Sequence, residues 1–136
     1  MEVQPLRLER VPYDFNAAFQ TASANAAQIA LVLSSIIFTR HASEIAQLAS
    51  KHGIPAMYTA RHYANAGGLM SYGVEFSAMW RKAAGMVAKL LRGAKASDLP
   101  VELANKFETV VNLKTAKSMG IELPISILLR ADEVIE

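Results

Sequence analysis

The sequence predicts an α/β fold of three layers, in which a parallel sheet lies between helices on both of its faces. Strand-like and helix-like segments alternate along the chain, which is typical of strands joined by right-handed helical crossovers. Residues 29–33 form a continuous apolar run, the pattern of a strand covered on both faces. With 136 residues, 52% of them hydrophobic, the chain is long and apolar enough to form a packed core.

The beginning of the chain supplies two predicted strands and one helix. A loose alternation of apolar and polar residues predicts a strand over residues 3–9, and the apolar run predicts another over 29–33. Between them, Pro12 and Asp14 begin a helix whose apolar residues recur at helical spacing. This order gives the first strand-helix-strand unit of the sheet.

The middle of the first half continues the alternation with shorter elements. A helical period starts at about Arg40 and ends at Gly53, which is a common residue just after a helix. Short strands are predicted at 56–58 and 69–72, and a brief helical turn at 61–66 lies between them. The sheet is therefore expected to gain two further strands here.

The second half begins with the clearest helix of the sequence. Apolar residues keep the 3.6-residue period over 76–91, and Gly93 follows as a stop. A polar link leads to a strand at 108–113 and a short helix that ends at Gly120. A last amphipathic helix begins at Pro124.

These elements divide the chain into two parts. We expect an α/β ligand-binding lobe over residues 1–93 and a tail over 94–136. The tail has one strand and two short helices, which pack on the lobe or on a partner lobe. Because ligands of α/β sheets bind beyond the carboxyl ends of the strands, the loops that follow the strands are where site residues are expected.

Composition and motifs exclude several classes of function. The net charge of +2 comes from bases scattered along the chain, which argues against a nucleic-acid partner. The chain has no cysteine, so a thiolate metal site and a cysteine nucleophile are excluded. It also lacks the glycine-rich phosphate loops of nucleotide-binding proteins and the serine elbow of hydrolases. We therefore expect no cofactor and no catalytic residue.

Three loops after predicted strands carry small polar and aromatic side chains. In chain order, the candidate ligand-binding residues are Ser34, Ser35, Thr59, Arg61, Tyr72 and Gly73. Hydroxyl and free backbone N–H groups bind anions such as carboxylates, and a guanidinium binds a carboxylate through two parallel hydrogen bonds. Tyrosine rings offer flat apolar faces to a planar solute. Together the loops predict a pocket for a small organic molecule.

Structural interpretations compete with this pocket. Serines after a strand are common helix N-caps, Arg61 fits a structural ion pair equally well, and Tyr72 fits the core of a buried strand. His41 and His62 lie on two of the loops, and paired histidines bind metals or share proton transfer. Neither loop contributes an acid as a further ligand or orienting partner, so no metal site is expected.

Several motifs of this chain, in order and spacing, resemble one family. They are the run Gly-Gly-Leu-Met-Ser-Tyr-Gly at 67–73, Arg61-His62-Tyr63 just before it, and Asn-Leu-Lys-Thr-Ala at 112–116. These motifs resemble the ABC transporter substrate-binding proteins of the tryptophan/tyrosine type, and the resemblance covers essentially the whole chain. It implies a type I periplasmic-binding-protein fold, whose two Rossmann-like lobes close around a solute without catalysis.

The resemblance also implies a role. It implies the solute-binding component of an ABC importer, periplasmic in location, which presents an amino acid or other carboxylate to membrane permease subunits. The six candidate residues would line one wall of the cleft. Where the family often has an aspartate after the first serine, this chain has Ser35, so capture of an amino group does not follow the family pattern.

The chain resembles only the C-terminal lobe of these proteins. Its first ten residues hold no apolar block, so no signal peptide is predicted. We expect weak or undetectable solute affinity for one lobe alone, and a homodimer that covers apolar surface meant for the other lobe. A ligand-sensing or dimerisation domain of a regulatory protein is the alternative function, and an enzyme that uses His41 and His62 is a third.

Overall fold

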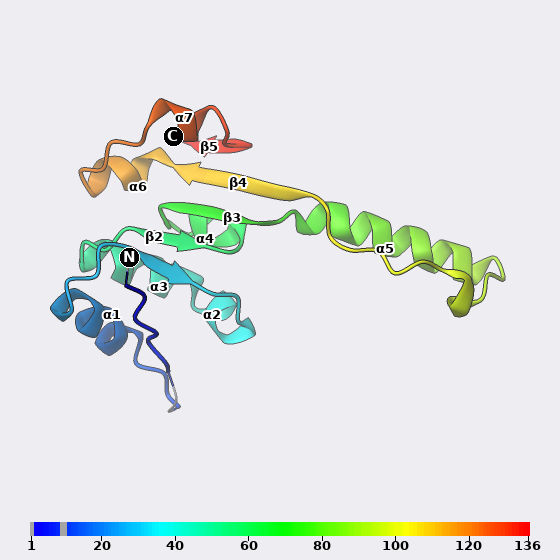
Figure 1. Cartoon of the computed structure of the whole chain (residues 1–136), viewed down its shortest axis with the longest axis horizontal. Helices are drawn as coiled ribbons and strands as arrows, with labels where there is room; N and C mark the ends of the chain where they lie inside the picture. Colours follow the sequence, from blue (N-terminus) through cyan, green and yellow to red (C-terminus); the bar gives the residue numbers. More distant parts are fainter. Residues whose placement is uncertain (1, 9–10) are drawn as a thin grey trace.

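The computed structural model describes residues 2–8 and 11–136 and contains a five-stranded sheet in the order β1-β2-β3-β4-β5 (Figure 1). The strands are β1 (Ala30–Val32), β2 (Ala56–Tyr58), β3 (Met70–Val74), β4 (Phe107–Asn112) and β5 (Glu133–Ile135). β1, β2 and β3 are parallel, β4 runs antiparallel to β3, and β5 runs parallel to β4. The predicted α/β class, with a mostly parallel sheet flanked by helices, is confirmed.

Helices connect the strands. They are α1 (Phe15–Ala24), α2 (Ile36–Arg40), α3 (Ala42–Lys51), α4 (Arg61–Asn65), α5 (Phe76–Leu91), α6 (Leu113–Ser118) and α7 (Ile125–Leu128), with a 3-10 turn, η1 (Ala96–Asp98). Asp14 begins α1 as predicted, because its Oδ1 accepts a hydrogen bond from the backbone N–H of Ala17 at 2.8 Å. Gly53 follows α3 with a φ of +65°, a left-handed conformation that glycine adopts without steric cost.

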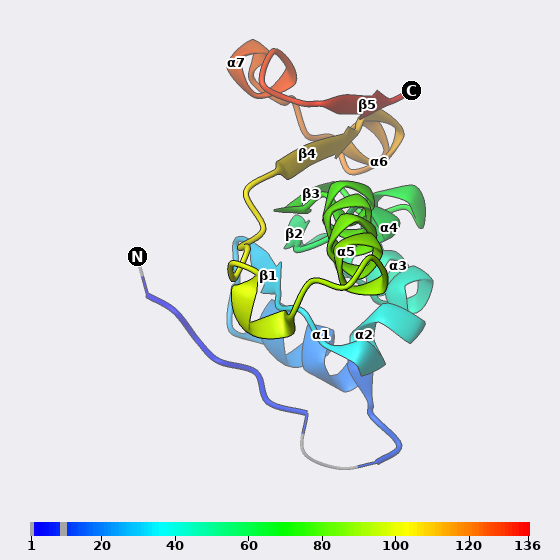
Figure 2. The same ribbon diagram turned by 90° about the vertical axis from the view of Figure 1, so that its right-hand side faces the viewer.

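The core lies between the sheet and the helices α1, α3 and α4. Side chains alternate across the strands, and the register partners Tyr58 and Ser71 are buried on the covered face. Figure 2 shows α3 and α4 on one side of the sheet and α7 on the other, beside β4 and β5. The core includes Phe15, Phe19, Ala22, Ile45, Ala49, Ile54, Ala56, Tyr58 and Tyr63.

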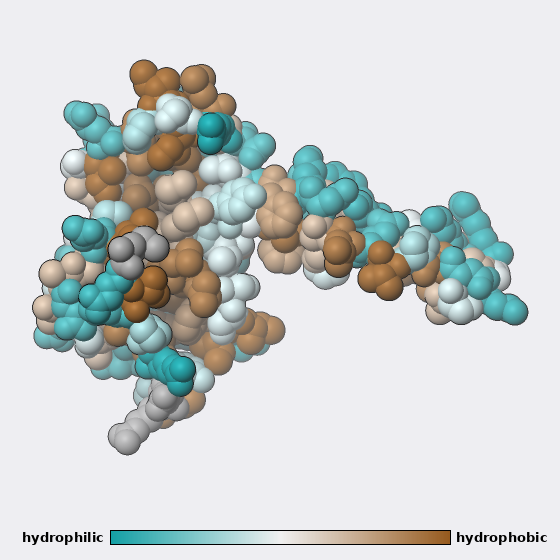
Figure 3. All heavy atoms as spheres, in the orientation of Figure 1, coloured by the Kyte–Doolittle hydropathy of each residue, from teal (hydrophilic) through white to brown (hydrophobic). Residues whose placement is uncertain are grey.

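Two predictions for the beginning of the sheet were wrong. Residues 3–8 have no regular structure, and Glu9 of that predicted strand lies outside the described residues. β1 has only β2 as a neighbour, so its second edge makes no strand pairing among the described residues. The run 29–33 is not covered on both faces, because Leu31 is 63% exposed. Figure 3 shows apolar surface on this open face of the body.

The second half of the chain leaves the sheet and returns to it. α5 projects away from the sheet, and the chain runs back beside it (Figure 1). It therefore re-enters the sheet at the edge where β3 ended, which explains why β4 is antiparallel and why Val74 pairs with Phe107. β5 was not predicted and gives the tail a second strand. The division into 1–93 and 94–136 stays a prediction.

The helix α5 has the predicted period but no buried residue. Its apolar side chains form a stripe in which Trp80 is 64% and Leu91 83% exposed. The stripe lies along the projecting part of the molecule in Figure 3. Among the helices of residues 2–8 and 11–136, none combines the length and apolar character needed to cross a membrane.

Candidate functional site

A cavity of about 300 Å³ opens at the carboxyl ends of β1, β2 and β3. Its lining residues are Ser34, Thr59, Tyr72, Gly73, Val74, Phe76 and Phe107. Ser34 follows β1, Thr59 follows β2 directly, and Tyr72 lies near the end of β3. This volume is at the lower end of the range of about 300–1,000 Å³ that is typical of ligand pockets. Four of the six candidate residues therefore lie around one cavity.

Three aromatic rings border the cavity, and we call Tyr72, Phe76 and Phe107 the aromatic shelf. Tyr72 and Phe107 lie on adjacent strands, with ring centroids 5.7 Å apart and ring planes 17° from parallel. Phe76 is the first residue of α5. The exposed fractions of the three residues are 50%, 45% and 45% in chain order. Large aromatic faces that remain half exposed are suited to contact with a planar apolar molecule.

Gly73 sets the distance between the ends of β2 and β3. A β-carbon at this position would lie 1.8 Å from the carbonyl oxygen of Thr59 and 2.7 Å from its carbonyl carbon. Both atoms belong to the backbone, so a side chain at residue 73 cannot be accommodated by a change of rotamer. The glycine therefore keeps the Thr59 segment and the Tyr72 segment close enough to share one cavity.

The two hydroxyl residues that line the cavity differ in exposure. Ser34 is exposed, whereas the Oγ1 atom of Thr59 is shielded from solvent and has no hydrogen-bond partner. Buried hydroxyl groups are normally hydrogen-bonded, so the Thr59 hydroxyl is an exception, and it is not exposed on the cavity surface.

Ser35 and Arg61 do not line this cavity. The Oγ of Ser35 accepts a hydrogen bond from the backbone N–H of Ile37 at 3.3 Å and begins α2, a helix that the sequence did not predict. The guanidinium of Arg61 donates to Glu108 at 3.2 Å and to Glu133. Ser35 is therefore the N-cap of α2, and Arg61 forms structural ion pairs.

The two histidines have separate structural partners. His41 Nδ1 lies 2.8 Å from Glu44 Oε2, an acid one helical turn away, and its ring packs on Phe15 at 5.0 Å between centroids. The ring of His62 packs on Tyr63 at 4.3 Å. Within residues 2–8 and 11–136, no group of three or more His, Asp or Glu side chains is arranged to hold a metal ion.

His62 predicts a pH dependence of stability. Burial lowers its pKa from the ordinary 6.5, and its Nε2 is shielded without a hydrogen-bond partner. The unfolded chain therefore binds a proton at His62 more readily than the folded chain. We expect the free energy of unfolding to be insensitive to this group above about pH 6.5 and to fall as the pH drops further.

Urea denaturation at several pH values measures this effect. The variant His62→Phe should lose most of the decline, whereas His52→Gln should keep it, because His52 hydrogen-bonds Asn16 at an exposed site. An unchanged decline in His62→Phe would assign the pH dependence to other groups.

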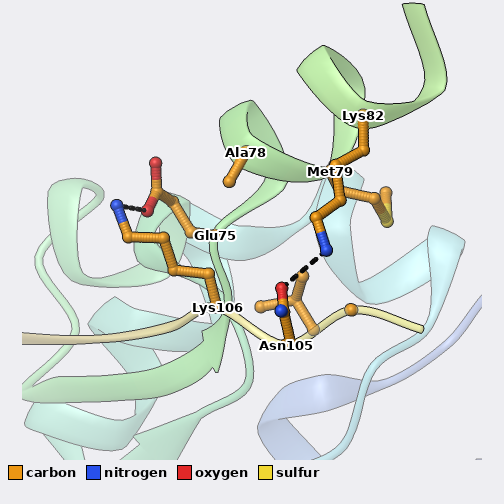
Figure 4. A pocket seen from close by; sticks show the side chains of 8 residues that line it. Glu75, Ala78, Met79, Lys82, Asn105 and Lys106 are labelled. Atoms are coloured by element: carbon orange, nitrogen blue, oxygen red, sulfur yellow. Dashed lines mark hydrogen bonds and ion pairs between the residues drawn. The ribbon is translucent and has the colours of Figure 1, made fainter. Parts of the chain in front are cut away.

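A second hollow lies where α5 leaves the sheet (Figure 4). Its volume is only about 10 Å³, room for a single water molecule. The carboxylate of Glu75 pairs with two bases: Lys106 Nζ lies 2.6 Å from Oε2, and the guanidinium of Arg81 lies 3.2 Å from Oε1. Lys82 donates a hydrogen bond to Asn105 at 2.8 Å. The hydrogen bond from Lys106 lowers the pKa of Glu75. These contacts brace the base of α5 and leave no space for an organic ligand.

Comparison with known proteins places the chain in a family. The family model described as ABC transporter substrate binding protein matches residues 2–135. The chain belongs to this family. ABC transporter substrate-binding proteins bind solutes for transporters, do not form an enzyme family and typically act outside the cytoplasm. No curated protein matches the chain.

Solved structures share the fold of this substrate-binding protein. A conserved domain protein from Vibrio cholerae has a TM-score of 0.79 at 23% identity over 89% of this chain and 40% of its own. The ABC domain in complex with L-Trp from Streptococcus pneumoniae has a TM-score of 0.78 at 22% identity, over 89% of this chain and 42% of its own. A ligand-free, open substrate binding protein with adhesive properties from Clostridium difficile has a TM-score of 0.64 at 22% identity, over 90% of this chain and 42% of its own. The chain spans about two fifths of their length.

Three lining residues were missed as candidates by sequence reasoning. Val74 and Phe76 belong to the candidate loop after the strand predicted at 69–72. They were not chosen because their apolar side chains offer no hydrogen bond to a solute. Phe107 begins an antiparallel strand, so its arrival at this edge follows only from the return of the chain after α5. The one available signal was an aromatic residue directly before the strand predicted at 108–113.

Proposed function

We propose that this chain is the solute-binding part of an ABC importer and holds a small organic solute, such as an amino acid or other carboxylate, at the cavity of Ser34, Thr59, Tyr72 and Gly73. In this role it presents the solute to permease subunits, carries out no catalysis and acts in the periplasm. Membership of the substrate-binding family supports transport, and the L-Trp of one structural neighbour supports a small organic solute.

The observation that carries this proposal is the position of the cavity. Polar and aromatic side chains from three successive strands meet at the carboxyl edge of the sheet, where α/β proteins bind small molecules. The cavity is open on one side, and its aromatic residues remain about half exposed. It therefore supplies one wall of a site.

Titration of the chain with amino acids and small carboxylates, followed by amide chemical shifts, tests the proposal. A ligand pocket normally covers about 70–90% of the solute surface, and one open wall covers much less. We expect saturable binding in the range of roughly millimolar dissociation constants, about −4 kcal/mol, with shifts at Thr59 and Gly73. The variant Ser34→Ala with Thr59→Val should weaken it. Submicromolar binding would contradict the one-wall interpretation, and the absence of shifts across the panel would contradict the function.

We also propose that the chain associates with a second copy in solution. The exposed stripe of α5, with Trp80, Val87 and Leu91 on one side of the helix, is apolar surface that water contacts unfavourably. Light scattering at increasing concentration should give a dimer mass, and Trp80→Glu with Leu91→Glu should return the chain to a monomer. A monomer at every concentration would contradict this association.

A further inference from the structure

We propose that Arg61 and Glu108 are positioning residues of the cavity, because their ion pair holds the Thr59 segment of the cavity wall in place on β3 and β4. The proposal rests on the proposed function and deepens it, since it gives a role in solute binding to two charged residues that do not line the cavity. It combines the close approach of two backbone segments, the burial of one carboxylate and the short stretch of chain between the ion pair and the cavity wall.

The close approach of Thr59 to Gly73 is the contact that the ion pair secures. A β-carbon on Gly73 would lie 1.8 Å from the carbonyl oxygen of Thr59, so this oxygen occupies the space that a side chain would need. Within the described part of the chain, the Thr59 hydroxyl has no hydrogen-bond partner, and Ala60 begins α4 without a side-chain cap. The next residue, Arg61, carries the first side-chain hydrogen bond after β2. The guanidinium of Arg61 is therefore the polar group that ties this segment to the sheet.

Glu108 provides the other end of the tie. It is the register partner of Gly73, and its side chain lies on the sheet face that α4 covers, because the alternate residue Val110 is buried there. Only 11% of the Glu108 side chain is exposed, so its carboxylate has lost hydration and needs an opposite charge. Arg61 Nη1 lies 3.2 Å from Glu108 Oε2. The pair thus joins a residue two positions beyond Thr59 to the strand position directly beside Gly73.

The far end of α4 is attached independently of Arg61. Asn112 Nδ2 donates a buried hydrogen bond to the carbonyl of Ala64 at 3.0 Å. When Arg61 is replaced, α4 therefore stays attached to β4, whereas the start of the helix and the Thr59 segment lose their tie. Glu133 of β5 also accepts a hydrogen bond from Arg61, but its side chain is 45% exposed, so solvent screens this second ion pair. We therefore expect variants of Arg61 to fold and to change the cavity wall locally.

Two substitutions that remove opposite charges test this role. Arg61→Met and Glu108→Gln each break the ion pair, and each variant is titrated with L-tryptophan and with propionate while amide chemical shifts are followed. We expect both variants to raise the dissociation constants by about fivefold, because the Thr59 segment is no longer held in place. Direct binding of a solute carboxylate by Arg61 predicts a different pattern. In that case Glu108→Gln would free the guanidinium for the solute and lower the dissociation constants.

The solute-free chain supplies a second readout. The amide shift of Gly73 should change in Arg61→Met, and that of Thr59 should change in Glu108→Gln, although each lies far along the chain from the substitution. Arg61→Lys keeps the positive charge and should recover most of the affinity.

A control variant and a check of folding complete the experiment. Glu44→Gln removes the acid partner of His41, an ion pair outside the cavity, and should change neither the amide shifts of Thr59 and Gly73 nor the affinity. Circular dichroism checks that each variant is folded. If Arg61→Met folds poorly, Arg61→Lys and Glu108→Gln still decide between positioning and direct contact.

The outcomes separate this inference from the proposed function. If Glu108→Gln strengthens binding, Arg61 contacts the solute and the positioning role is wrong. If both variants keep the affinity of the unmodified chain, the ion pair serves stability alone, and the inference is wrong while solute binding stands. If the unmodified chain binds neither probe, the proposed function fails, whereas altered solute-free shifts at Thr59 and Gly73 would still support the tie between the two segments.

Discussion

Alanine at Gly73 is expected to destabilise the chain by roughly 3 kcal/mol or more and to abolish the cavity. The added β-carbon would meet the backbone of Thr59 at 1.8 Å, so the ends of β2 and β3 have to separate. Chemical denaturation measures the loss of stability, and loss of the amide chemical-shift changes on titration with amino acids measures the loss of the cavity.

Gly85→Ala is the matched control for Gly73→Ala. Gly85 lies inside α5, and a β-carbon there meets no atom within 4 Å. Because alanine has the higher helix propensity, this variant should gain about 0.5–1 kcal/mol of stability. Equal stability of the two variants would show that the close approach of Thr59 and Gly73 is absent in solution.

Tyr58→Ala is expected to cost about 3–5 kcal/mol, a large part of the total stability of a domain of this size. Tyr58 is 1% exposed, and its ring stacks on Tyr63 with centroids 4.9 Å apart. Removal of the ring leaves a cavity at the centre of the core beneath β2. Urea denaturation followed by circular dichroism measures the change.

Tyr58→Phe separates the ring from its hydroxyl group. The Tyr58 hydroxyl is buried without a hydrogen-bond partner, and burial raises the pKa of Tyr58 well above its ordinary value. Replacing an unpaired buried hydroxyl by hydrogen removes a desolvation cost, so this variant should be as stable as the original chain or more stable by up to about 1 kcal/mol. A cost close to that of Tyr58→Ala would mean that the hydroxyl has a partner.

Local elements were predicted well where one face of the element is packed or a stop residue is present. The short strand at 56–58 and the helix at 76–91 agree with β2 and α5 residue for residue. Strand-like alternation at 3–9 failed, because a strand also needs a neighbour for its backbone hydrogen bonds. The direction of β4 depends on the end of the sheet to which the chain returns after α5, which no local pattern encodes.

The candidate site was predictable to the extent that chain order determines position. Ser34, Thr59, Tyr72 and Gly73 each follow or end a parallel strand, and the carboxyl ends of such strands meet at one edge. The environment of Arg61 was not predictable, because its partners come from distant strands of the tail. Whether the six residues bind a solute stays a prediction.

At the base of α5, the segment that leaves the sheet and the segment that returns to it lie side by side next to the cavity. The backbone N–H of Glu75 donates to the carbonyl of Lys106 at 3.0 Å, beside the pairing of Val74 with Phe107. Phe76 and Phe107 thus lie at the base of α5, a helix of 16 residues that is about 24 Å long. Because Phe76 is the first residue of α5, the direction in which α5 leaves the sheet also determines where one of the three rings at the cavity lies.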